Sequence, residues 1–525
     1  MFKQARHIFK LVHAGRVIAR HGGFDAALDD DQVPTFAKAA LRLVGAGKSS
    51  SAQRAGLADA LNELGPSYIK LGQFLATRPD MIGADRANAL RQLQDRMTSF
   101  GMNEAREIIR AGLGKSSGEI FHSLSEPVAA ASIAQVHRAQ IADDNGRLMD
   151  VAVKVLRPGV EARFRDDLET FFTVARLAER FSAEARRLNI IKAVETLERS
   201  VELEMDLRLE ASAMSEMAEN TRNDPGFRVP AVYWQQTARR VLTSEWIDGI
   251  ALTDTPALDA SGLDLPKLGD TVIQSFLRHA MRDGFFHADM HQGNLFIDAT
   301  NNLVAVDFGI MGRLSPKDRR FLAEILWGFI KRDYKRIADV HFDAGYVPHS
   351  QDVHLFAQAL RAIGEPIMGK NSTDISMARL LTQLFEVTGQ FSMETQPQLI
   401  LLQKTMVVVE GVARSFNPEL NMWVTAEPVV AEWMEQKLGA RGQLEDAAEG
   451  AATIGRLAAS FPEVLSELGQ VSALVSSMAR SGGIRLDHET TDAIAAAQAR
   501  HSGSKRGALW VSAIALVVLA VSMAL

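Results

Sequence analysis

The sequence has 525 residues, of which 47% are hydrophobic and 23% are charged, so we expect several globular domains with well-packed apolar cores. The formal net charge of −6 argues against nucleic acid as the main partner. The chain has no cysteine, which excludes disulfide bonds, thiolate nucleophiles and cysteine-ligated zinc or iron–sulfur sites.

Residues 1–24 form a basic segment, because several lysines and arginines precede the first acidic residue, Asp25. Apolar residues lie between them, a pattern typical of a helix on a membrane surface and equally of a basic first helix packed on its own domain. The sequence leaves both alternatives open. Helices are predicted over residues 25–125, with a break at Gly65-Pro66. After the break, Lys70, Gln73 and Thr77 form one polar stripe of an amphipathic helix.

A kinase-like phosphate loop with alanines in place of glycines is predicted next. Residues 129–136 have the sequence AAASIAQV, which matches the spacing G-x-G-x-x-G-x-V. The β-prone runs SIAQVHRAQI and DVAVKVL surround an Asn-Gly turn and predict a hairpin within a strand-like region that begins at about residue 128. Alanine resists positive φ, so we expect this loop to hold phosphates differently from a glycine loop. The predicted nucleotide-binding residues are Ala129, Ala130, Ala131, Ser132 and Val136.

Three further motifs match the catalytic parts of a kinase in order and spacing. VAVK ends at Lys154, residues 287–294 have the pattern H-x-D-x-x-x-x-N, and a DFG triplet begins at Asp307. We expect Lys154 to hold the phosphates of ATP, and Asp307 and Asn294 to bind Mg²⁺. Asp289 would accept a proton from, or orient, an attacking hydroxyl group or water.

A long helical region over about residues 160–220 carries a group of acidic side chains. Glu202, Asp206 and Glu210 have the spacing i, i+4, i+8 and are predicted to share one helix face. A kinase fold needs one helix glutamate to pair with the strand lysine, and we predict that Glu210 fills this role. The alternative is a solvated acidic face balanced by neighbouring arginines.

Beyond these helices, strands are predicted at residues 228–234 and 238–247. The chain is then expected to be mostly helical to about residue 435, with short strands at 294–297 and 303–306. After the DFG triplet it passes straight into a helix, without an A-P-E triplet and without room for an activation segment. This absence argues against a protein as the substrate.

The last segment, ALWVSAIALVVLAVSMAL at residues 508–525, has no charged side chain. As a helix it would extend roughly 27 Å, just enough to cross a thin bilayer. Basic residues immediately before it place the rest of the chain on the cytoplasmic side by the positive-inside rule. A buried C-terminal helix is the alternative.

Together these segments resemble the UbiB/AarF family of atypical kinase-like proteins, which is associated with ubiquinone biosynthesis. The resemblance runs in order from about residue 60 to 315. It is carried by LGPSYIKLGQFLATRPD, PVAAASIAQVHRA, VAVKVLRPG, ELEMDLRLEA, VLTSEWIDG, FFHADMHQGNLF and VAVDFGIMGRL.

The resemblance assigns roles to residues that spacing alone leaves as an ordinary amphipathic helix or acidic face. It implies that Lys70-Leu71-Gly72-Gln73 is the family's KxGQ motif, whose helix lies over the active site and blocks the usual protein-substrate cleft. It implies that Glu204-Met205-Asp206 is the ExD motif, a partner of that lysine, and it supports the pairing of Glu210 with Lys154. It also implies a hinge in which backbone groups of Glu245 and Ile247 meet adenine.

The sequence therefore predicts an α/β (α+β) fold, a two-lobed protein-kinase-like fold with a helical N-terminal extension and a C-terminal transmembrane helix. The expected parts are the extension over 1–125, an N-lobe over 126–249, a helical C-lobe over 250–436, a linker with amphipathic helices over 437–507 and the anchor over 508–525.

The resemblance implies an ATPase that binds ATP and Mg²⁺ and supports ubiquinone biosynthesis at the bacterial inner (cytoplasmic) membrane. Its partners would be membrane lipids, polyprenyl quinone intermediates and other enzymes of quinone biosynthesis, and a homodimer is left open. A lipid or small-molecule kinase and a nucleotide-gated scaffold without enzymatic activity are the alternatives.

Overall fold

The computed structural model describes residues 2–21, 56–76, 78–82, 97–181, 188–368 and 397–438, with a few isolated positions between these ranges. The chain divides into two compact units, residues 1–430 with 511–525, and residues 431–510. The fold described below belongs to the first unit, except for residues 431–438, which belong to the second. The five-part division expected from the sequence stays a prediction.

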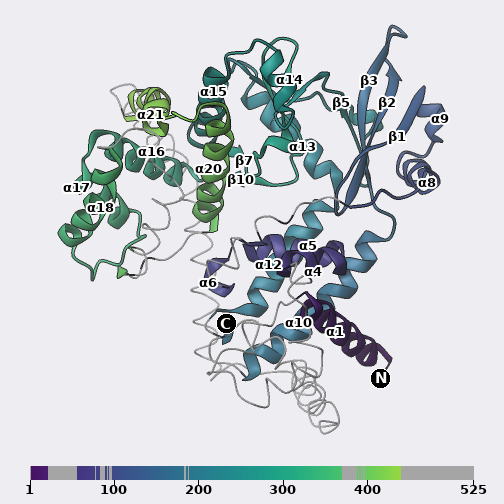
Figure 1. Ribbon diagram of the computed structural model, residues 1–525, viewed down its shortest axis with the longest axis horizontal. Coiled ribbons are helices and arrows are strands. Elements are labelled where there is room, and N and C mark those ends of the chain that lie inside the picture. Colours follow the sequence, from purple (N-terminus) through teal and green to yellow (C-terminus); the bar gives the residue numbers. More distant parts are fainter. Residues whose placement is uncertain are drawn as a thin grey trace, which may run out of the picture. The chain divides into compact units, whose positions relative to one another are not determined.

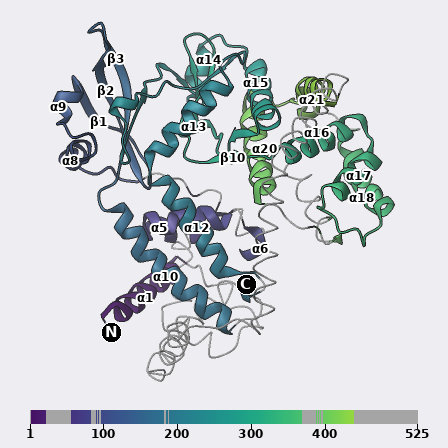
Figure 2. The ribbon, with the colours of Figure 1, turned by 180° about the vertical axis from the view of Figure 1, so that it is seen from behind.

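Helices from residues 2–82 and 160–204 form one group (Figure 1). Helix α10 runs beside α12, and both contact α5 (Figures 1 and 2). The basic helix α1 packs on α4 and α10, with Val17 buried and Lys10 paired with Asp167 of α10 at 2.6 Å. Of the two alternatives for the basic segment, the structure therefore shows the packed first helix. The helices are α1 (Phe2–Arg20), α4 (Gly56–Leu64), α5 (Pro66–Ala76), α6 (Pro79–Ile82), α10 (Val160–Phe181) and α12 (Ile190–Glu204).

An antiparallel sheet with strand order β1-β2-β3-β5 forms the next layer. Its strands are β1 (Ser123–Ala130), β2 (Ala134–Ala142), β3 (Leu148–Leu156) and β5 (Val241–Glu245). The predicted hairpin is confirmed as β2 and β3, with Gly146 in its turn at φ 77°. The strand-like region starts earlier than predicted, because β1 begins at Ser123.

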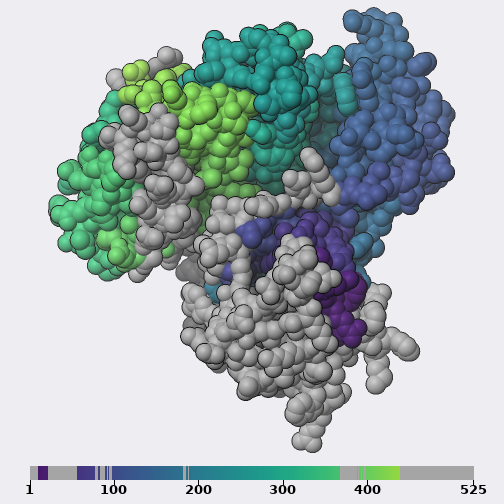
Figure 3. Space-filling view, in the orientation of Figure 1, coloured from purple at the N-terminus to yellow at the C-terminus, as the bar shows by residue number. Residues whose placement is uncertain are grey.

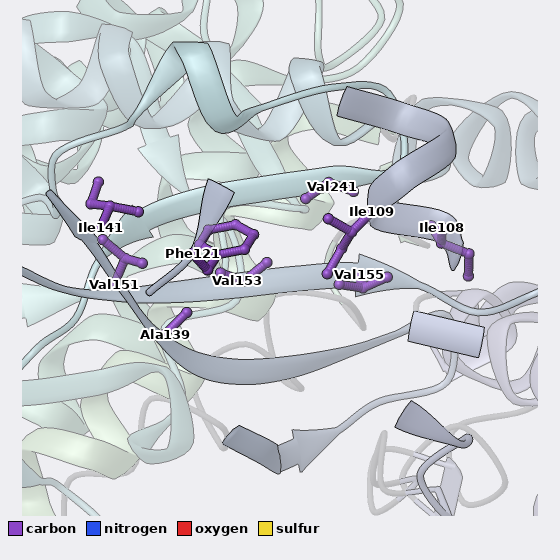
Figure 4. Packing of buried hydrophobic residues seen from close by; sticks show 9 residues of the cluster. All are labelled: Ile108, Ile109, Phe121, Ala139, Ile141, Val151, Val153, Val155 and Val241. Carbon is purple, nitrogen blue, oxygen red and sulfur yellow. The ribbon is translucent and has the colours of Figure 1, made fainter. Parts of the chain in front are cut away.

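One face of this sheet is covered by helix α8 (Met102–Leu113), which lies before the short helix α9 (Ser117–Ile120). Ile109 of α8 belongs to the same buried cluster as Val151, Val153 and Val155, which alternate along β3, and it lies beside Val155 (Figure 4). Burial of each such side chain contributes about 1.5–3 kcal/mol. Since side chains alternate across a strand, Lys154 points to the opposite face. The core on one face thus fixes the lysine on the other.

The predicted strand at 228–234 is mostly wrong. Only Phe227–Arg228 forms strand β4, Val232 makes an isolated bridge, and Trp234–Gln236 is a 3₁₀ turn, η2. Pro230 lacks an N–H donor, which is why a continuous ladder fails here.

A second sheet has the order β4-β9-β8-β6, and strand β7 pairs separately with β10. Its members β8 and β9 confirm the short strands predicted near 294–297 and 303–306. The bounds are β6 (Gly249–Ala251), β7 (Phe285–His287), β8 (Leu295–Asp298), β9 (Leu303–Ala305) and β10 (Met311–Arg313), with the 3₁₀ turn η4 at Gln292–Asn294.

Helices make up the rest. After β10 the chain enters α16 directly, with Ser315 as its N-cap and Pro316 in its first turn. Helix α20 lies against α15, and Figure 3 shows the bright green surface of this part of the chain beside the teal one. The helices are α13 (Leu207–Asn220), α14 (Thr255–Ala260), α15 (Leu265–Arg278) with the π-helix η3 (His279–Asp283), α16 (Pro316–Lys331), α17 (Tyr334–Asp343), α18 (Val353–Met368), α20 (Pro397–Phe416) and α21 (Met422–Leu438).

The described part of the chain contains no helix with both the length and the apolar character needed to cross a bilayer. The predicted anchor at residues 508–525 and the predicted amphipathic helices of the linker lie outside the described residues.

Candidate active site

Lys154 lies between two carboxylates. Its Nζ is 2.8 and 3.0 Å from the two oxygens of Glu210, on α13, and 2.9 Å from Oδ1 of Asp307. The side chains of Lys154 and Glu210 are 15% and 8% exposed, whereas that of Asp307 is 46% exposed. The structure therefore brings together Lys154, its predicted partner Glu210 and the predicted Mg²⁺ ligand Asp307.

The charges of this trio support one another. Burial by itself would lower the pKa of Lys154, but the carboxylates of Asp307 and Glu210 raise it above its usual range, so the lysine stays a cation. Burial raises the pKa of Glu210 to about 7, against the attraction of Lys154. For Asp307, burial would raise the pKa, but Lys154 and, more weakly, Lys70 hold it well below its usual range. Asp307 is therefore an anion facing solvent on one side and Lys154 on the other.

The backbone of Asp307 is in the left-handed region, at φ 61°. For a residue other than glycine this conformation costs about 1–2 kcal/mol, although aspartate tolerates it better than most. Phe308 is buried beside it and meets the ring of His287 edge-on, with centroids 5.1 Å apart. The strained backbone is thus held by packing on one side and by Lys154 on the other.

His287 joins the loop of Asp289 to the strand that precedes Asp307. Its Nδ1 accepts a hydrogen bond from the Asp289 amide at 3.1 Å, and its Nε2 lies 3.1 Å from the Val306 carbonyl oxygen. Nε2 must therefore carry the proton and donate it to Val306. Burial lowers the pKa of His287, which agrees with a neutral ring. We interpret this histidine as a structural link between the two segments.

Asn294, the second predicted Mg²⁺ ligand, is held by hydrogen bonds to the Asp289 loop and to Val306. Its side-chain Nδ2 donates to the backbone carbonyl oxygen of Asp289 at 3.1 Å, and its backbone carbonyl oxygen accepts from the Val306 amide at 2.9 Å. The side-chain oxygen of Asn294 and the carboxylate of Asp307 are the hard oxygen donors that Mg²⁺ prefers. Among the described residues no group of three or more His, Cys, Asp or Glu side chains could hold a metal alone. The residues fit a Mg²⁺ that is held jointly with phosphate oxygens.

Asp289 has two positively chargeable neighbours, each beyond hydrogen-bonding distance. Nε2 of His291 is 3.6 Å from Oδ2, and Nζ of Lys404 is 3.9 Å from Oδ1. Lys404 lies on α20, far away in the sequence, and no motif or spacing pointed to it. Only the packing of α20 on the loop reveals it.

The alanine-rich segment forms the tight connection between β1 and β2. Ala129 pairs with Val136 across the two strands, and the Ala131 amide donates to the Ala134 carbonyl oxygen at 2.8 Å. The Ala131 carbonyl oxygen accepts from Nε of Arg157 at 2.9 Å, and Ser132 is fully buried. Ala130 ends β1. Both backbone groups of Ala131 are used within the protein, so in this conformation its amide does not face a phosphate.

The KxGQ lysine meets the ExD glutamate. Nζ of Lys70 is 2.6 Å from Oε2 of Glu204, and both side chains are almost buried. Gly72 allows α5 to approach its neighbours, since an added Cβ would lie 2.4 Å from Leu93 Cδ1. Gln73 lies partly exposed on the same helix.

The predicted single acidic helix face is wrong. Helix α12 ends at Glu204 and α13 starts at Leu207, with Asp206 as its N-cap. The Asp206 carboxylate accepts from the Arg208 amide at 3.1 Å and pairs with the Arg208 guanidinium at 2.6 Å. An aspartate that caps the next helix interrupts the first one, so Glu202, Asp206 and Glu210 do not share a face.

The predicted hinge lies at the end of β5. The Glu245 amide donates to the Ala231 carbonyl oxygen at 2.8 Å, so a contact of Glu245 with adenine would use its carbonyl oxygen. The Glu245 carboxylate accepts two hydrogen bonds from Arg228, whose Nε also donates to Asp298 at 2.6 Å. Ile247 follows, partly exposed. Arg228 thus ties the hinge to the second sheet.

Two family models match the part of the chain that carries most of these residues. The model of the ABC1 atypical kinase-like domain matches residues 92–341, and that of the UbiB helical domain matches residues 360–421. A relative named "Probable protein kinase UbiB" from Marinobacter nauticus is 41% identical over 391 residues, 74% of this chain and 71% of the relative. One of the same name from Pseudomonas aeruginosa is 37% identical over 478 residues, 88% of each chain.

A solved structure is also similar. It is titled the complex structure of Rv3197-erythromycin from Mycobacterium tuberculosis, is 25% identical, and covers 73% of this chain and 94% of that one with a TM-score of 0.45.

Proposed function

Because the chain belongs to the UbiB family of ABC1 atypical kinase-like proteins, which implies a role in ubiquinone biosynthesis, we propose that it is a Mg²⁺-dependent ATPase supporting that pathway. ATP turnover would make polyprenyl quinone intermediates accessible to soluble enzymes. The observation that carries the proposal is the bridge of Lys154 between Glu210 and Asp307, linked through His287 to the loop with Asp289.

Each residue of the site has a task in phosphoryl transfer. Glu210 keeps Lys154 charged and in place, and Lys154 binds the phosphates. A Mg²⁺ bound by Asn294 and Asp307 would neutralise charge on the phosphate oxygens. The oxygen of the attacking water bonds to the γ-phosphorus, and Asp289 receives the proton that this water loses. The bond between the γ-phosphorus and the bridging oxygen breaks, and its electron pair leaves with ADP.

Two features support water or a small molecule as the acceptor rather than a protein. Helix α5 lies close to the site, since the positive charge of Lys70 helps to lower the pKa of Asp307, and Lys70 pairs with Glu204 on α12. The chain also runs from the DFG triplet through the short β10 into α16, so it offers no long segment to dock a peptide.

The test uses Asp307→Asn, which keeps the shape of the side chain and removes its charge. We expect purified full-length variant to lose Mg²⁺-dependent ATPase activity, and a deletion strain carrying it to accumulate a quinone precursor. Asp339→Asn, at an exposed pair with Lys335, is the matched control and should behave as wild type. An Asp307→Asn protein with full ATPase activity that supports quinone synthesis would refute the proposal. Labelled ATP that marks a membrane component instead of releasing phosphate would identify a lipid kinase.

Membrane attachment through residues 508–525 is part of the proposal. An arginine in the middle of a spanning helix costs about 2.5–3.5 kcal/mol on insertion. We therefore expect Val518→Arg to move the full chain from the membrane fraction to the supernatant after carbonate extraction, while Ser504→Arg, just before the segment, stays in the membrane. Equal fractionation of the two variants would contradict the anchor.

A further inference from the structure

Helix α20 is fixed on the loop that carries Asp289. Oγ1 of Thr405, which is fully buried, lies 3.1 Å from the Ala288 carbonyl oxygen, 117 positions away in the sequence, and 2.8 Å from the Leu401 carbonyl oxygen of its own helix, so it shares its one proton between them. At the other end of the loop, Nε2 of Gln292 donates to Oγ of Ser415 at 2.7 Å. These two bonds bracket Asp289 and define where α20 stands relative to it.

The same helix is held closely from behind. Gly269 of α15 faces the Ala413 carbonyl, and a Cβ at this glycine would lie 2.8 Å from that oxygen. The close approach of α15 and α20 leaves little freedom for α20 to shift along the loop. Lys404, the residue before Thr405, is therefore a lysine on a fixed backbone next to the loop.

The two charged neighbours of Asp289 face different oxygens of its carboxylate. Nδ1 of His291 accepts from the Gly293 amide at 3.0 Å, so in the neutral ring the proton is on Nε2, which lies 3.6 Å from Oδ2. Lys404 approaches Oδ1, at 3.9 Å. Both distances are just too long for a hydrogen bond, so each contact is a charge interaction. The carboxylate is thus oriented by one group from its own loop and one from α20.

We propose that Lys404 is a positioning residue for Asp289 and that the lysine's ammonium group holds the carboxylate turned toward the attacking oxygen. The inference deepens and rests on the proposed ATPase function. It also makes the region matched by the UbiB helical domain, which contains α20, part of the catalytic machinery. If Lys404 served only in packing, its position would tolerate any side chain of similar length, whereas the proposed role requires a positive charge.

The test compares Lys404→Met with Lys404→Arg in the full-length protein. We expect Lys404→Met to lower kcat for ATP hydrolysis about 10–100-fold, at the lower end of what positioned proton transfer contributes, with KM for ATP little changed. Lys404→Arg should keep most of kcat, because it keeps the charge. The matched control is Lys335→Met, which removes an exposed lysine paired with Asp339 on α17 and should leave kcat unchanged.

A double-mutant cycle separates this role from a structural one. Because Lys404 acts through Asp289, adding Lys404→Met to Asp289→Asn should cause little further loss of kcat. Equal losses in Lys404→Met and Lys404→Arg, or a full additional loss in the Asp289→Asn background, would overturn the inference in favour of a packing role. An active wild type with an unaffected Lys404→Met variant would overturn this inference alone. A wild type without Mg²⁺-dependent ATPase activity would overturn the proposed function together with it.

Discussion

Replacement of Asp298 by asparagine should lower the unfolding free energy of the protein and also raise its KM for ATP. Asp298 ends β8 and is 9% exposed. Its carboxylate accepts from Nε of Arg228 at 2.6 Å, from the Thr300 amide and hydroxyl at 2.9 and 2.7 Å, and from the Asn302 amide at 3.0 Å. Arg228 in turn holds Glu245 at the predicted hinge. An asparagine keeps the size of the side chain but loses the charge that anchors Arg228.

The magnitude follows from the pKa. Burial acts to raise the pKa of Asp298, but Arg228 and the backbone and hydroxyl donors of the turn lower it from 3.8 to about 2. Each pKa unit corresponds to about 1.36 kcal/mol, so ionised Asp298 contributes about 2.5 kcal/mol at neutral pH. A carboxyl whose pKa is depressed by folding stabilises the fold above its unfolded pKa and loses this effect as the pH falls toward its folded pKa. The gap between wild type and variant should therefore be constant above about pH 4 and close toward pH 2.

The assay pairs two variants of similar stability cost. Burial opposes ionisation of Asp224 as well, but His279 and Arg282 lower its pKa to about 2. Asp224 pairs with Arg282 and not with Arg228, the arginine that binds Glu245 at the hinge. Between pH 7 and pH 3, the urea-unfolding midpoints of Asp298→Asn and Asp224→Asn should lie below that of wild type by similar amounts. Only Asp298→Asn should raise KM for ATP. Wild-type stability of Asp298→Asn at pH 7 would refute the ion-pair assignment, and equal KM values in the two variants would refute the link to the hinge.

The remaining predictions concern two small residues. Ala131→Gly should tighten ATP binding, because glycine adds the positive-φ conformations that alanine resists and can release the Ala131 amide from Ala134; unchanged calorimetric affinities for both ATP and ADP would leave the alanines without such a role. Gly72→Ala should lower the unfolding free energy by about 1–3 kcal/mol through overpacking against Leu61 and Leu93, as measured by thermal unfolding. Gly118→Ala, where no atom lies within 4 Å of the added Cβ, is the control, and an equal effect at both sites would contradict the packing argument.

Much of the fold and part of the site follow from local patterns in the sequence. The family assignment made from the motifs is confirmed, and so is a mixed α/β kinase-like fold. Alternation along β3 alone puts Lys154 opposite the valines of the core, because strand geometry leaves no other choice. Strand and turn signals likewise located β2, β3, β8 and β9.

The failures have physical causes that a periodic pattern does not contain. The spacing of Glu202, Asp206 and Glu210 fits one helix, but Asp206 uses its carboxylate to start a new helix instead. Lys404 was missed because its role depends on how α20 packs on a loop far away in sequence. A local helix cap decides the first question, and tertiary packing decides the second.

The contacts of the site together explain why its chemistry should be restrained. The Ala131 amide is bonded to Ala134, and Lys154 is bonded to Asp307, so each must be exchanged or shared when phosphates and Mg²⁺ enter. Lys70 is paired with the nearly buried Glu204, and movement of α5 away from α12 would leave each of these charges without that partner. A nucleotide therefore has to displace internal bonds without displacing α5. In the proposed ATPase, these contacts would favour water or a small molecule over a protein as the acceptor.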